Sequence, residues 1–98
     1  MVIQDILSLL ETAQTPVIKI LQQQASGKVL ALGFKKGMIL KEHQTTVPAK
    51  LVIIEGTVLY KQGEESVTLN KLSDLDIPVK IPHGVEALQD SICLLILS

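Results

Sequence analysis

The sequence predicts an all-β domain, a sandwich or a barrel, preceded by one short helix. Short runs rich in Val, Ile and Leu recur at even intervals, and turn residues, several of them glycine, separate these runs. Only one segment has its apolar residues at helical spacing, so the strand and helix alternation of a parallel sheet is missing. Many short strands joined by glycine turns are typical of a sandwich or a barrel.

The one predicted helix is amphipathic and lies within residues 1–14. Thr15 precedes Pro16, and the residue before a proline is disfavoured in the α region, so the helix must end there. The polar face of the helix carries no Lys or Arg, which argues against a role at a membrane surface. The apolar positions at helical spacing are Val2, Ile3, Ile6, Leu7, Leu9 and Leu10.

Nine strands are predicted after this helix. Alternate residues of a strand face opposite ways, and two of the runs are apolar throughout, so a barrel core alone cannot cover both of their faces. The helix or a second subunit must cover the remainder, and we predict a homodimer joined by strands outside the barrel. The strands are expected at residues 17–21, 28–34, 38–42, 51–55, 57–62, 66–69, 75–78, 84–88 and 92–97.

Length, charge and composition exclude several classes of protein. The 98 residues suit one domain over residues 1–98, and 47% hydrophobic content is ample for a core. A net charge of −1 does not provide the positive electrostatic field that attracts nucleic acids. An aromatic content of 2% also leaves too few side chains for bases to stack on. No window spans a bilayer and no secretory signal is present, so we predict a cytoplasmic protein with no membrane partner. Cys93 lies in an apolar run and is expected to be an inert core thiol.

The two histidines lie at distinctive places in the chain. His43 lies between a glycine turn and the β-branched run that ends at Gly56. His83 follows Pro78 and Pro82, and because proline donates no ladder hydrogen bond, this segment belongs at a strand end or a barrel rim. If both imidazoles point into one interior, they define a site.

These residues resemble the conserved motifs of the cupin family, specifically its small single-domain members. The first cupin motif runs glycine, five residues, His, one residue, His, three or four residues, Glu, six residues and glycine. Gly37, His43 and Gly56 occupy their positions in this sequence. Thr45 stands where the second His is usual, and Ala49 stands where the Glu is usual.

The second cupin motif runs proline, one residue, glycine, two residues, His, three residues and Asn. Pro78 and His83 match it, whereas Lys80 stands at the glycine position and Ala87 at the Asn position. The resemblance covers residues 29–97 and implies a cupin-type barrel, which is a jelly roll or double-stranded β-helix.

The resemblance also implies a metal site, because cupins hold a metal on three imidazoles and a carboxylate. His43 and His83 are the matching ligands here, for a divalent ion such as Zn, Ni, Fe or Mn. Two imidazoles alone hold such an ion weakly, so Glu42, Gln44 or a dimer partner would have to supply further ligands. Alternatively, the two histidines bond to each other, to a water or to Thr45, since buried polar groups need partners. The expected pocket neighbours are Thr45, Gln44 and Ala49.

Three functions remain open at this point. The first is a binding module that holds a small molecule or a weakly bound divalent metal through His43 and His83. The second is an enzyme that resembles cupin dioxygenases or isomerases, in which a metal polarises a substrate oxygen. The third is a structural or oligomerising barrel with a vestigial pocket. The replacement of two ligands, by Thr45 and Ala49, argues against the enzyme.

Four further polar features are expected to have simpler roles. Glu55 faces either the pocket or the solvent, since charged strand residues are usually solvated. Residues 64–65 are predicted at a hairpin tip, and Asp74 and Asp76 in a turn. Tyr60 is expected to pack on a strand with its hydroxyl in water.

Overall fold

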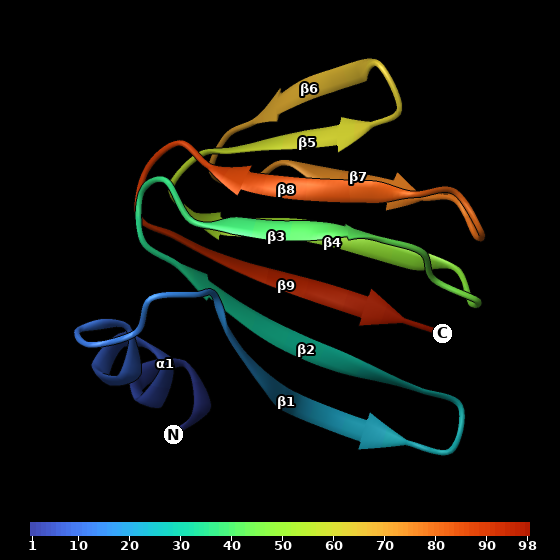
Figure 1. Cartoon of the computed structure of the whole chain (residues 1–98). Coiled ribbons are helices and arrows are strands. Elements are labelled where there is room, and N and C mark those ends of the chain that lie inside the picture. The colour runs from blue at the N-terminus through green and yellow to red at the C-terminus, as the bar shows by residue number, and fades with distance from the viewer.

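The computed structural model describes all 98 residues and contains one helix followed by nine antiparallel strands (Figure 1). The helix ends earlier than residue 14, whereas each of the nine predicted strands is present with small shifts at its ends. The elements are α1 (Val2–Leu10), β1 (Val17–Gln24), β2 (Gly27–Phe34), β3 (Ile39–His43), β4 (Ala49–Glu55), β5 (Val58–Gln62), β6 (Glu65–Leu69), β7 (Asp74–Ile77), β8 (His83–Ala87) and β9 (Ser91–Leu97).

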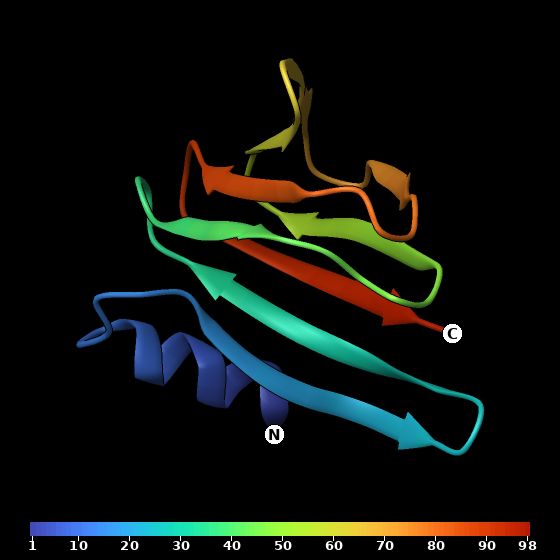
Figure 2. The same ribbon diagram turned by 45° about the vertical axis from the view of Figure 1, so that its right-hand side comes forward.

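The strands form two sheets that enclose one core (Figure 2). One sheet has the order β1-β2-β9-β4-β7 and the other has the order β3-β8-β5-β6. Alternate side chains of each strand point inward, so the apolar residues of both sheets meet between them. This is the predicted jelly-roll barrel. The inward-facing core includes Leu32, Phe34, Leu51, Ile53, Val58, Val85, Cys93 and Leu95.

Helix α1 covers the outer face of the five-stranded sheet. Ile6 and Leu10 are buried there against Ala31 and Ile92, and they form a second, smaller core. A Cβ atom added to Gly33 of β2 would overlap Ile6 Cγ2, so the helix packs directly on the glycine backbone. The helix therefore supplies one of the two alternative covers that the sequence predicted for the apolar strands.

The turn predicted at Asp74 and Asp76 is wrong, and the hairpin tip predicted at residues 64–65 is confirmed for Glu64 only. Asp74 and Asp76 lie in β7, where alternation turns both carboxylates outward, and each pairs with Lys50 Nζ at 3.2 Å. Lys50 lies directly opposite Asp76 in the register of β4 and β7. Glu65 begins β6 and pairs with Gln62 of β5, so the hairpin turn lies before it.

Predictions for other single side chains agree with the structure. Cys93 is fully buried, and this burial raises the pKa of its thiol to about 12. Glu55 is exposed to solvent, where its carboxylate lies 3.2 Å from Lys71 Nζ. No helix has the length and apolar character needed to cross a membrane.

Candidate functional site

His43 and His83 lie side by side on neighbouring strands of the four-stranded sheet. His43 ends β3 and His83 begins β8, and the two residues are direct partners in the register. Their ring centroids are 4.4 Å apart, with the planes tilted by 58°. Only 1% of His83 is exposed, whereas His43 is partly exposed. The structure thus brings together the two imidazoles that the sequence singled out.

A β-bulge in β3 makes this pairing possible. Leu40 pairs with Val85 and His43 pairs with His83, with a register shift between the two pairs. In a regular strand, residues 40 and 43 would face opposite sides, whereas residues 83 and 85 share one side. The extra residue of the bulge places Leu40 and His43 on the same side, toward the interior. No turn residue or proline within residues 39–43 signals this bulge in the sequence.

Each imidazole is fixed by a hydrogen bond to a backbone carbonyl two residues earlier. The His43 Nδ1 lies 2.9 Å from the Lys41 oxygen, and the His83 Nδ1 lies 3.1 Å from the Ile81 oxygen. A carbonyl oxygen can only accept, so both Nδ1 atoms carry the proton and donate. In the neutral tautomer each Nε2 then has a free lone pair, which is the state that accepts a hydrogen bond or ligates a metal.

The environment of His83 keeps that imidazole neutral. Burial lowers the pKa of His83 below its ordinary value of 6.5, and the nearby His43 lowers it further. The bond to the Ile81 carbonyl and the charge of Glu42 raise the pKa, but each has a smaller effect than burial. At neutral pH the His83 ring is therefore uncharged, and its Nε2 can accept a hydrogen bond.

Tyr60 of β5 extends the histidine pair into a row of three rings. Its ring stacks on His83 with centroids 5.8 Å apart and an angle of 23° between the planes. Tyr60 is only 3% exposed and its hydroxyl donates to Gln62 Oε1 at 2.9 Å, so the prediction of a hydroxyl in water is wrong. The sequence held a signal for the burial of Tyr60. Val58, Tyr60 and Gln62 alternate along β5 and share one side of the strand, and Val58 is a core residue, so Tyr60 also faces inward.

The three predicted pocket neighbours have different positions. Thr45 follows β3, and its Oγ1 is buried with no hydrogen-bond partner. Gln44 is exposed, so it does not belong to the interior. Ala49 is buried in β4, opposite Ile77 and Leu97, and it is part of the main core. Thr45 is the only one of the three with a buried polar side-chain atom that has no hydrogen-bond partner.

Two cavities open near the ring row, one at each side of the barrel. The larger one, which we call the His43 groove, has a volume of about 490 Å³. It lies between the β1–β2 hairpin and β3, and aliphatic side chains make up much of its wall, with Lys41 and Glu42 beside His43. The aliphatic walls are Ile18, Leu30, Leu32, Ile39, Leu40 and Leu95.

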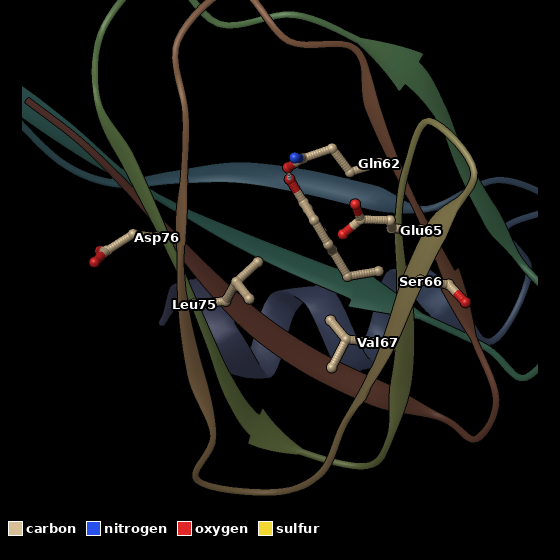
Figure 3. A pocket seen from close by; sticks show the side chains of 7 residues that line it. Gln62, Glu65, Ser66, Val67, Leu75 and Asp76 are labelled. Carbon is tan, nitrogen blue, oxygen red and sulfur yellow. Dashed lines mark hydrogen bonds between the residues drawn. The ribbon is translucent and has the colours of Figure 1, made fainter.

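The smaller cavity, of about 200 Å³, lies between β5, β6 and β7 and includes Tyr60 (Figure 3). Figure 3 shows Gln62 and Glu65 near Val67 and Leu75 at this cavity. Asp76 is turned away from the other labelled side chains, consistent with its ion pair to Lys50.

The residues around the histidine pair do not form a complete metal-binding set. No group of three or more His, Cys, Asp or Glu side chains converges anywhere in the chain. The pair thus offers two imidazole nitrogens, and a protein site for a transition metal ordinarily needs at least three protein ligands. The donors fit a loosely held ion, and no reaction step through a metal follows from them.

Backbone conformation explains two positions of the cupin motifs. Gly56 has a φ of 86°, and an added Cβ would overlap the Asp90 carbonyl and the Ser91 side chain. Lys80, which stands at a glycine position, has a φ of 60°. Both positions use the left-handed region that favours glycine, so the chain keeps the turn shape even where the glycine is lost.

The two facing sheets and a histidine of β3 beside one of β8 define the chain as a small cupin-fold domain. Solved cupin structures share this fold. A cupin protein of the RmlC-like type from Desulfovibrio desulfuricans has a TM-score of 0.81 and 24% identity, over 87% of this chain and 83% of that one. A cupin superfamily protein from Desulfitobacterium hafniense has a TM-score of 0.81 and 18% identity, over 92% and 84% of the two chains.

A third similar structure extends over nearly the whole chain. A protein containing a cupin-2 domain from Shewanella frigidimarina has a TM-score of 0.74 and 16% identity, over 96% of this chain and 89% of that one. No protein-family model matches the sequence, and no curated protein matches it either. At these identities the similarity establishes the fold.

Proposed function

We propose that this chain is a binding protein for a small molecule, held in the His43 groove. The observation that carries the proposal is a groove of about 490 Å³ in which one imidazole lies among aliphatic walls. This volume suits a small organic ligand, since ligand pockets are mostly apolar with a few oriented polar groups. The imidazole is fixed through Nδ1 and offers Nε2 as an acceptor. The ligand class is therefore an apolar body that carries one hydroxyl or N–H donor.

The test uses 1-octanol as the probe and n-octane as the comparison, with amide shifts in ¹H–¹⁵N spectra as the measurement. We expect 1-octanol to shift the amides of Ile18, Leu40 and His43 and to bind more tightly than n-octane. His43→Leu should remove this preference, because one neutral hydrogen bond contributes about 1 kcal/mol, or roughly a fivefold change in affinity. His43→Gln keeps an acceptor and should retain part of the preference. Shifts that spread evenly over the barrel would refute the proposal.

A second candidate function is weak binding of a divalent metal on the same pair. The observation in its favour is that both Nδ1 atoms are bonded to carbonyls, at 2.9 and 3.1 Å, so both Nε2 atoms are available. With two protein ligands, we expect Zn²⁺ to bind only in the high micromolar range or weaker. Calorimetric titration of purified protein with ZnCl₂ measures this affinity. His43→Ala and His83→Ala should each abolish binding, while removal of the exposed Gln44 side chain should not.

The same two measurements decide between the remaining functions. A chain that binds neither the alcohol nor zinc at the histidine pair would be a structural barrel. Sub-micromolar zinc affinity would require further ligands and would favour the enzyme alternative, a metal-dependent dioxygenase or isomerase.

A further inference from the structure

The smaller cavity, which we call the Tyr60 cavity, is a separate hollow that shares no lining residue with the His43 groove. Strands β5, β6 and β7 supply its walls, and β6 and β7 are each the outermost strand of their sheet. The cavity therefore opens between the two sheet edges. Tyr60, which is only 3% exposed, is its most deeply buried lining residue.

The Tyr60 cavity carries one negative charge that no cation balances. Of the two acidic residues that line it, Asp76 has its carboxylate on Lys50 Nζ and is turned away from the other labelled side chains (Figure 3). Glu65 takes part in none of the ion pairs of the chain. No basic residue lines the cavity, and Lys61 of β5 faces the opposite side, where it pairs with Glu86 at 2.9 Å.

The buried hydroxyl of Tyr60 adds a hydrogen-bond acceptor. It donates to Gln62 Oε1 at 2.9 Å, and burial raises the pKa of Tyr60 above its ordinary value of 10, so the hydroxyl keeps its proton. The phenolic oxygen receives no hydrogen bond from the chain and still has an acceptor site. Figure 3 shows the Gln62 amide and the Glu65 carboxylate directed toward the middle of the labelled side chains. A ligand in the cavity thus meets oxygen acceptors.

The remaining walls are apolar and limit the size of a ligand. Val67 of β6 is 41% exposed, and Leu75 of β7 is partly buried, and both line the cavity. Figure 3 shows these two side chains on the same side of the cavity. A volume of about 200 Å³ holds roughly six or seven non-hydrogen atoms, since a water molecule occupies about 30 Å³ of liquid. A short alkyl chain fits this space.

From the charge, the acceptors and the walls we infer that the Tyr60 cavity binds a small primary aliphatic amine. Its ammonium group donates to the Glu65 carboxylate and to the Tyr60 oxygen, and its alkyl chain lies against Val67 and Leu75. An ammonium group has three donors and no acceptor, which matches this set of oxygens. Glu65 would repel a carboxylate ligand, and a bare metal ion would leave the apolar walls uncovered. This inference goes beyond the proposed function and does not depend on it.

Titration with n-pentylammonium chloride, followed by amide shifts in ¹H–¹⁵N spectra at fixed pH and ionic strength, tests the inference. We expect saturable shifts at Gln62, Glu65 and Val67, with a dissociation constant in the millimolar range because the ligand is small. The uncharged comparison is 1-pentanol, which has the same shape but no charge. It should bind the Tyr60 cavity at least about threefold more weakly.

Two variants identify the groups that hold the ammonium. Glu65→Gln keeps the shape of the side chain and should weaken binding about threefold or more, which is the effect of one exposed charge pair. Glu64→Gln is the matched control, because it removes the same charge from the adjacent exposed residue, which does not line the cavity. Its affinity should stay close to that of the wild type. Tyr60→Phe keeps the ring on His83, removes the acceptor oxygen and should also weaken binding.

Three results would overturn the inference: amide shifts that do not saturate, equal affinity for the amine and the alcohol, or equal losses in Glu64→Gln and Glu65→Gln. The last would show that the field of the hairpin, and not a contact in the cavity, attracts the amine. His43→Leu removes the acceptor of the groove and should leave the binding of the amine unchanged. The two sites are therefore tested independently.

Discussion

Replacement of Lys80 by glycine should stabilise the protein. Lys80 has a φ of 60°, in the region where the Cβ of an L-residue crowds the following carbonyl. Its side chain is exposed and takes part in none of the ion pairs of the chain. Its backbone N–H donates to the Thr45 oxygen at 2.8 Å, and glycine would keep that bond. The substitution thus removes a strained Cβ and little else.

The size of the gain is the difference between two terms. The left-handed conformation costs a residue with a Cβ about 1–2 kcal/mol. Glycine has more freedom in the unfolded chain, and this freedom costs about 0.5–1 kcal/mol on folding. The net gain in the free energy of unfolding should therefore be about 0.5–1 kcal/mol. For a domain of this length, it corresponds to a rise in Tm of about 2–8 °C.

Thermal and urea unfolding of Lys80→Gly, followed by circular dichroism, measure the gain. The matched control is Lys80→Ala, which removes the same charge and the same chain but keeps the Cβ, so its stability should stay close to that of the wild type. If the alanine variant gains as much as the glycine variant, the lysine side chain rather than the backbone was unfavourable, and the reasoning fails. A glycine variant less stable than the wild type would refute it directly.

Three further predictions concern buried groups. Burial lowers the pKa of His83, so below pH 6.5 the unfolded chain binds more protons than the folded one, and the free energy of unfolding should decrease as the pH falls. Urea unfolding at pH 7.5 and 5.5 measures this loss, which should be smaller in His83→Phe; an equal loss in that variant would assign it to other groups. The thiol of Cys93, with a pKa of about 12, should react with Ellman's reagent only as the protein unfolds, and rapid labelling of the native chain would show that the site opens. Gly33→Ala should lower the stability by about 1–3 kcal/mol in urea unfolding through its overlap with Ile6, and it should cost less in an Ile6→Ala background.

The sequence predicted the strands well because their apolar runs are local signals. The continuous apolar run at 92–97 marks β9, which is buried between β2 and β4, and Gly56 marks the turn between β4 and β5. The helix was placed correctly but ends at Leu10, since the apolar pattern does not show where backbone bonding stops. The errors at Asp74 and Asp76 arose because acidic residues also suit the solvent face of a strand.

The candidate site was predicted only in part, because its geometry depends on contacts between distant segments. The two histidines were found through their motif positions, and the structure places them in contact. The bulge that turns His43 inward has no local signature, since it depends on the register with β8. The burial of Tyr60 had a local signal in the alternation along β5, but its stacking on His83 had none, because that contact requires β5 and β8 to be neighbours.

The order of strands within the larger sheet has a consequence for how the chain folds. Strand β9 comes last along these residues, yet it lies in the middle of its sheet, hydrogen bonded to β2 on one side and β4 on the other. Until Ser91–Leu97 has left the ribosome, β2 and β4 have no partner at these inner edges, and both carry the apolar sequences that favour aggregation. The pairing of β9 with β2 and β4 must then join segments that are far apart in the sequence, and such pairing makes folding slow for a chain of this size. Nascent chains that stop before residue 91 should thus depend on chaperones.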